Sequence, residues 1–65
     1  MTTELMEVFS LEVGDQILIK EDIYKIFEIG VADVDYLLYL VDENGYKRII
    51  QAEDTKKFKV IVEDA

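Results

Sequence analysis

Short apolar runs separated by turn residues follow one another along this chain, and no long helical pattern lies between them. Each run is rich in β-branched or aromatic residues and ends at a turn signal. The five runs span residues 16–20, 23–29, 36–42, 46–51 and 57–62. In the last run Phe58, Val60 and Val62 alternate with Lys57 and Lys59, which predicts that the three apolar residues face inward. The pattern predicts five antiparallel strands that curl into a small barrel.

Two of these runs depart from simple alternation. In residues 23–29 one face would hold Ile23, Phe27 and Ile29, and this imperfect parity predicts a strand that bends. Gly30 is expected to mark the end of that strand. Residues 36–42 are apolar on both faces, which predicts a central strand that is covered on both sides.

The connections carry recognisable turn chemistry. Asn44 and Gly45 both tolerate a positive φ, so residues 42–46 are predicted to form a tight hairpin, and residues 52–55 a single 3₁₀ turn. At the N-terminus apolar side chains follow Thr3 at helical offsets, but the segment is too short for helix propensity alone to stabilise it. Residues 1–10 are therefore expected to be either a short helix or an extended arm before a barrel at 11–62, all in a single domain, 1–65.

Size and composition limit the chemistry that is available. A chain of 65 residues builds only a small core, and the absence of Cys and His excludes disulfides, thiolate zinc sites and the commonest general base. We expect no enzyme activity and no cofactor, and we expect oligomerisation to supply the missing stability. The opening Met1-Thr2-Thr3-Glu4 has no signal-peptide pattern, and no run is long enough for a membrane span, so a cytoplasmic location is expected.

Charge is distributed unevenly along the chain. The net charge is −8, with −9 in residues 1–45 and +1 in residues 46–65. Such a total repels phosphate at long range, so any face that binds nucleic acid is expected to lie in the C-terminal third.

The layout of a short N-terminal segment followed by five strands over residues 11–62 resembles the Sm-like (LSm) small SH3-like barrels, and most closely the short, acidic, Cys-free proteins of the marine cyanophage type. The resemblance implies a ring-shaped homo-oligomer, a role in RNA or DNA processing, and a phage-encoded protein in the host cytoplasm. The loops at 31–34 and 52–55 lack the RNA-contacting residues of that family, so the fold and the ring carry over better than the RNA site. Val13-Gly14-Asp15 is also similar to the start of KOW-type and translation-factor barrels, but the basic or Gly-rich loop of those barrels is missing.

A basic group from the last two runs and their link is the candidate surface for RNA or single-stranded DNA. Its members are Lys47, Arg48, Lys56, Lys57 and Lys59. Tyr46 and Tyr39 are candidate stacking platforms for unpaired bases. The alternative is that these lysines only protect an edge strand against unwanted pairing.

Self-association is the other interaction that the pattern predicts. One small barrel cannot cover both faces of residues 36–41, and the runs 46–51 and 57–62 are expected to pair edge to edge around a ring. The candidate interface residues are Tyr36, Leu38, Tyr39, Ile49 and Ile61.

Other chemistry finds little support in the sequence. The acids Asp33, Asp35, Asp42 and Glu43 match no calcium-loop spacing, so they are interpreted as solvated loop residues and no metal is expected. No membrane contact and no small-molecule substrate are expected either. The function that the sequence favours is a non-enzymatic Sm-like binding module. The alternative is an acidic protein-interaction adaptor or inhibitor that binds no nucleic acid.

Overall fold

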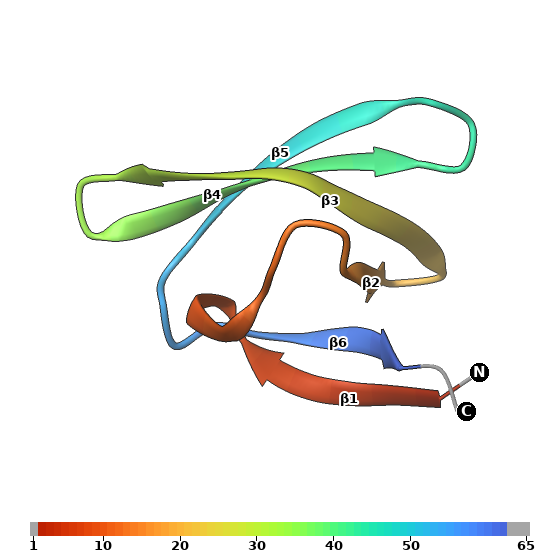
Figure 1. Ribbon diagram of the computed structural model, residues 1–65, viewed down its shortest axis with the longest axis horizontal. Coiled ribbons are helices and arrows are strands. Elements are labelled where there is room, and N and C mark those ends of the chain that lie inside the picture. Colours follow the sequence, from red (N-terminus) through yellow and green to blue (C-terminus); the bar gives the residue numbers. More distant parts are fainter. Residues whose placement is uncertain (1, 63–65) are drawn as a thin grey trace.

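The computed structural model describes residues 2–62, which form six β-strands and one short 3₁₀ helix (Figure 1). The elements are, in chain order, β1 (Thr2–Glu7), η1 (Val8–Ser10), β2 (Gln16–Ile19), β3 (Asp22–Ala32), β4 (Asp35–Asp42), β5 (Lys47–Ala52) and β6 (Lys57–Val62). The expectation of a mainly β chain is confirmed.

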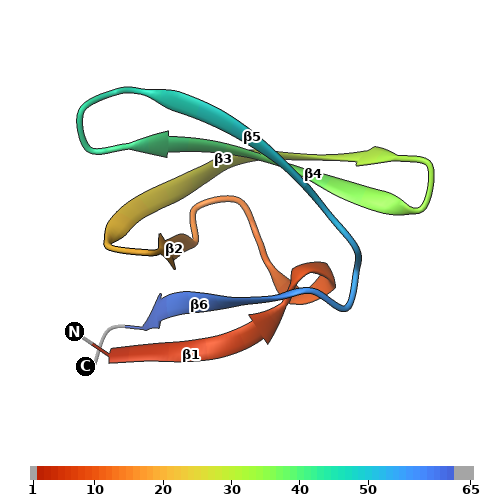
Figure 2. The same cartoon turned by 180° about the vertical axis from the view of Figure 1, so that it is seen from behind.

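All six strands belong to one sheet, in the order β1-β6-β2-β3-β4-β5, and every neighbouring pair is antiparallel. Figures 1 and 2 show the sheet strongly bent, with β1 and β6 on one side and β3, β4 and β5 on the other. The sheet is not closed, because β1 pairs only with β6 and β5 only with β4 among the described residues. The sequence predicted a barrel of five strands, whereas the structure is a curled, open sheet of six strands.

The additional strand is the N-terminal segment, for which the helix alternative was wrong. Residues 2–7 pair with β6 in an unbroken register that runs from Thr2 opposite Val62 to Glu7 opposite Lys57. Pairing with β6 gives backbone N–H and C=O groups of this segment hydrogen-bond partners. An isolated helix of two turns would be unstable in water because it is too short. The chain then turns through η1, where the Val8 N–H donates to the Lys56 carbonyl at 2.8 Å.

The five predicted strands are present, and β6 has the predicted bounds. The strand β3 is longer than expected, because Gly30 lies inside it and not at its end. A Cβ at Gly30 would lie 3.5 Å from Cε2 of Tyr39 on the neighbouring strand, which is an ordinary van der Waals contact, so the strand can pass through this position. The turn comes later, at Asp33, whose φ of 56° is in the left-handed region.

The predicted bend of β3 is confirmed as a β-bulge, since its register with β4 shifts between Ile26 and Glu28. The extra residue at the bulge also reverses which face of the sheet the following side chains occupy. Ile26 and Ile29 therefore both contribute to the core, while Phe27 is exposed on the outer face.

The two connections around β5 both form hydrogen-bonded turns. The hairpin at Asn44-Gly45 is confirmed, with Gly45 at a φ of 87°. Asp42 stabilises it, because its Oδ1 accepts the backbone N–H groups of Asn44 and Tyr46, each at 2.9 Å. The link after β5 contains the expected single turn, one residue later than predicted, with the Lys56 N–H donating to the Glu53 carbonyl at 3.0 Å in the i→i+3 pattern of a 3₁₀ turn.

The core lies between the two arms of the bent sheet. It consists of buried residues from every strand except β1, together with η1 and the segment that follows it: Val8, Leu11, Ile17, Ile26, Leu38, Leu40, Ala52 and Val60. As predicted, Val60 of β6 is buried and Phe58 packs against the core. Leu38 is fully buried here, so its side chain cannot form the contact between subunits that the sequence suggested.

Candidate nucleic-acid interface

The predicted basic group does not lie on one rim, because its members belong to strands that are far apart in the sheet. Lys47 and Arg48 begin β5, which is an edge strand. Lys57 and Lys59 lie on β6, and three strands separate β6 from β5 in the sheet order. The structure therefore divides the candidate residues into two sets, which have to be considered separately.

The set on β5 is engaged with aromatic rings of its own chain. Lys47 places its Nζ 5.4 Å from the centre of the Phe27 ring, and Arg48 places its Cζ 5.8 Å from the centre of the Tyr24 ring. Cation–π contacts of this kind hold the two cations against the sheet. Tyr46, in the adjacent hairpin, is 73% exposed and could stack on a base, but it lies at the opposite end of the sheet order from β6.

The second set surrounds a shallow cavity of about 310 Å³. Four lysines line it, of which sequence reasoning had selected all but the first: Lys20, Lys56, Lys57 and Lys59. Its apolar lining consists of Leu5, Leu18, Ile19 and Phe58. Among residues 2–62 no carboxylate contributes to this lining, and we call the cavity the lysine groove.

Lys20 joins the groove through the turn between β2 and β3, where its own φ is 58°. Sequence reasoning missed this residue because it belongs to the strongly acidic first 45 positions, whose net charge concealed it. Two acids lie opposite groove residues by register: Asp22 is opposite Ile19 across the β2–β3 pair, and Glu7 is opposite Lys57 across the β1–β6 pair. That opposition offsets part of the charge of Lys57.

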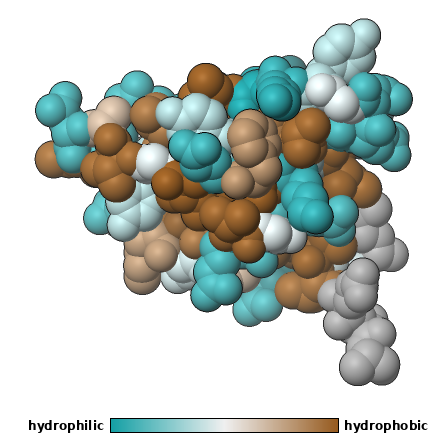
Figure 3. Space-filling model, turned by 45° about the horizontal axis from the view of Figure 1, so that its top comes forward, coloured by the Kyte–Doolittle hydropathy of each residue, from teal (hydrophilic) through white to brown (hydrophobic). Residues whose placement is uncertain are grey.

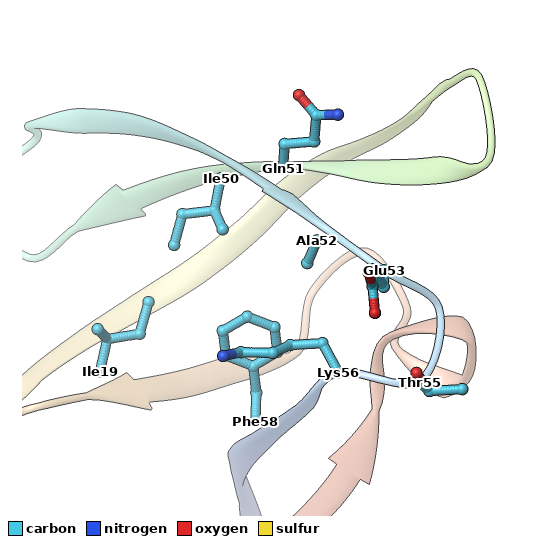
Figure 4. A pocket seen from close by; sticks show the side chains of 8 residues that line it. All are labelled: Ile19, Ile50, Gln51, Ala52, Glu53, Thr55, Lys56 and Phe58. Atoms are coloured by element: carbon cyan, nitrogen blue, oxygen red, sulfur yellow. The ribbon is translucent and has the colours of Figure 1, made fainter.

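A second cavity of about 530 Å³ adjoins the groove at the open side of the sheet, and we call it the side cleft (Figure 4). It shares Ile19, Lys56 and Phe58 with the lysine groove. Its remaining lining comes from β5 and the link after it: Ile50, Gln51, Ala52, Glu53 and Thr55. Figure 4 shows Ile50, Ile19 and Phe58 pointing into the space between β5 and the lower strands, whereas Gln51 points away from it.

Chemically, the two cavities together offer four ammonium groups beside apolar and aromatic surface. Of the acids in the described part of the chain, Glu53 alone belongs to their combined lining. Ammonium groups on flexible stems suit phosphate, and a half-buried ring such as Phe58 offers a face for a base. This local excess of positive charge contrasts with the −8 of the whole chain.

The predicted interface residues are also divided by the fold. Tyr39 and Ile49 lie opposite each other on the outer face of the β4–β5 pair, while Tyr36 lies opposite the buried Ala52 on the inner face. Ile61 lies on β6, opposite Thr3. The predicted pairing of the last two runs around a ring was wrong, because β6 already pairs with β1 on one edge and with β2 on the other.

Two of the four acids that could have suggested a calcium site accept hydrogen bonds within the fold. Asp42 caps the β4–β5 hairpin, and Asp35 accepts a hydrogen bond from the Gln51 side chain at 2.8 Å. Within residues 2–62, no three potential metal-ligating side chains come together. The same residues contain no helix with the length and apolar character that crossing a membrane requires.

Comparison with known proteins leaves the chain without an assigned family. No family model matches the sequence, and no curated protein matches it. The resemblance to Sm-like proteins therefore depends on strand layout alone.

Proposed function

We propose that this chain is a non-enzymatic binding module of the SH3-like, Sm-like type, which assembles with copies of itself and binds single-stranded nucleic acid along the lysine groove. The observation that carries the proposal is the gathering of four lysines in one groove to which no carboxylate of residues 2–62 contributes: Lys20, Lys56, Lys57 and Lys59. The curl of β6, β2, β3, β4 and β5 around one core supports the barrel-type architecture.

The charge of the chain determines what kind of binding to expect. A net charge of −8 opposes the approach of a polyanion, so only short-range contacts in the groove favour the complex. Each phosphate that is neutralised on a single strand contributes a slope of about −0.7 to the dependence of log K on log salt. Four lysine contacts predict a slope of about −3, and hence an affinity that falls about 50-fold between 50 and 200 mM salt.

The test is fluorescence anisotropy with labelled RNA and DNA oligonucleotides over this range of salt. The double variant Lys57→Gln/Lys59→Gln should halve the slope and weaken binding at low salt, because it removes two of the four groove cations. Lys25→Gln is the matched control, since this exposed lysine lies on β3 outside the groove. Equal effects of the two changes would contradict the groove assignment.

A second function has its own supporting observation. Most of the surface charge is acidic, and the side cleft has a largely apolar lining that could accept a side chain of a protein partner. An acidic adaptor of this kind would bind a basic protein and would ignore oligonucleotides. Anisotropy that stays flat with both RNA and DNA at low salt would favour the adaptor over the nucleic-acid module.

A further inference from the structure

The two edges of the sheet match each other in length and differ in charge. The edge strands β1 and β5 each have six residues. The acids Glu4 and Glu7 lie on β1, which has no base, whereas Lys47 and Arg48 lie on β5, which has no acid. Unpaired edges of this kind offer their backbone N–H and C=O groups to another strand.

We infer that the β1 edge of one copy pairs antiparallel with the β5 edge of the next copy. The charges favour this combination, because pairing β1 with β1 or β5 with β5 would bring like charges to one seam. The partner is thus a second copy of this chain, bound head to tail. Such a contact, repeated, closes into a ring or continues as a filament.

Full overlap of the two strands gives a register in which the side chains on the outer face are compatible. Glu7 lies opposite Lys47, and the exposed Leu5 lies opposite the exposed Ile49. These two apolar side chains are 62% and 60% exposed in the single chain, so the pairing covers both. Thr3 would lie opposite Gln51, which is a polar pair.

The register also keeps the two faces of the sheet consistent. Within β1, Leu5 and Glu7 lie opposite Lys59 and Lys57, on the face away from the core. Within β5, Ile49 lies opposite Tyr39 on the outer face. Residues that are directly opposite in an antiparallel pair point to the same side, so the outer face of one copy continues into the outer face of the next.

That outer face supports the assignment. Figure 3 views the molecule from the side of β3, β4 and β5, and it shows hydrophobic residues in the middle of this face with hydrophilic residues around them. Phe27 and Ile49 are both exposed large hydrophobic residues of this region. A neighbouring strand at β5 would reduce the exposed area of Ile49.

This inference rests on the self-association in the proposed function, and it is testable because the chain has no Cys. Residues opposite each other in an antiparallel pair have Cα atoms about 4.5–5.5 Å apart, which a disulfide can bridge. The experiment mixes full-length Leu5→Cys with full-length Ile49→Cys under oxidising conditions. We expect a covalent dimer that contains one copy of each variant, and none from either variant alone.

Two controls separate the possible failures. Leu5→Cys mixed with Val34→Cys should give no cross-link, because Val34 is 85% exposed but lies in the β3–β4 turn and not on an edge strand. Cross-linked dimers from a single variant would overturn the head-to-tail pairing in favour of like edges. Sedimentation of the unmodified chain shows whether it forms an oligomer at all. An oligomer without the mixed cross-link overturns only the edge assignment, whereas a monomer at all concentrations also refutes self-association in the proposed function.

Discussion

Truncation of Leu38 tests the packing of the core most strongly. This side chain is fully buried on β4, opposite Ile29 of β3 and Ile50 of β5. A buried Leu→Ala change costs about 2–5 kcal/mol, while a domain of this length has a free energy of unfolding of about 3–10 kcal/mol. Because the core of residues 2–62 has only eight buried residues, neighbours have little freedom to fill the space. We expect Leu38→Ala to lose about 3 kcal/mol.

Urea denaturation followed by far-ultraviolet circular dichroism measures this loss. With a slope of about 1 kcal/mol per molar urea, typical of a small domain, the midpoint should fall by about 3 M, or the variant should be unfolded without urea. Val34→Ala is the matched control and should change stability by less than about 0.5 kcal/mol. Both variants are compared at two protein concentrations, so that self-association is separated from folding. A loss below about 1 kcal/mol for Leu38→Ala would refute the reasoning.

Three turn and strand positions give further predictions, each measured as a urea midpoint. Gly45→Ala should cost about 1 kcal/mol or more, because φ is 87° there; an unchanged midpoint would contradict the hairpin geometry. Gly30→Ala should be neutral or slightly stabilising, since the new Cβ meets Tyr39 at an ordinary 3.5 Å; a large loss would show that β3 and β4 lie closer. Asp42→Ala should cost about 1–2 kcal/mol through two lost hydrogen bonds to backbone N–H groups, whereas Asp42→Asn should retain part of them.

The strands were predictable where the signal is local. Alternation located β6, and Asn44-Gly45 located the β4–β5 hairpin, because both patterns depend on neighbouring residues. The bulge in β3 could be anticipated from broken parity, although its position could not. Gly30 was misinterpreted as a strand end, because whether a glycine lies inside a strand depends on pairing with another strand, here opposite Leu37 of β4, which no local pattern reveals.

The remainder depended on contacts between residues far apart in the chain. Residues 2–7 form a strand only because β6, more than fifty positions later, offers a free edge. Because β6 pairs with β1, that edge of β6 is not available for the predicted ring contact. The basic group was divided for a similar reason, since sheet order, and not distance along the chain, decides whether Lys47 and Lys57 are neighbours. Lys20 lines the groove although it belongs to the acidic part of the sequence, so its charge did not stand out along the chain.

One titration tests the central claim that a lysine groove gives this acidic chain a surface for nucleic acid. The uniformly ¹⁵N-labelled protein is titrated at low salt with an unlabelled single-stranded oligonucleotide, and its amide resonances are followed by nuclear magnetic resonance. We predict saturable shifts at Lys20 and at residues 56–59, which line the groove, and their disappearance when salt is raised. Shifts confined to the hairpin at residues 44–48, or no shifts at all, would contradict the account.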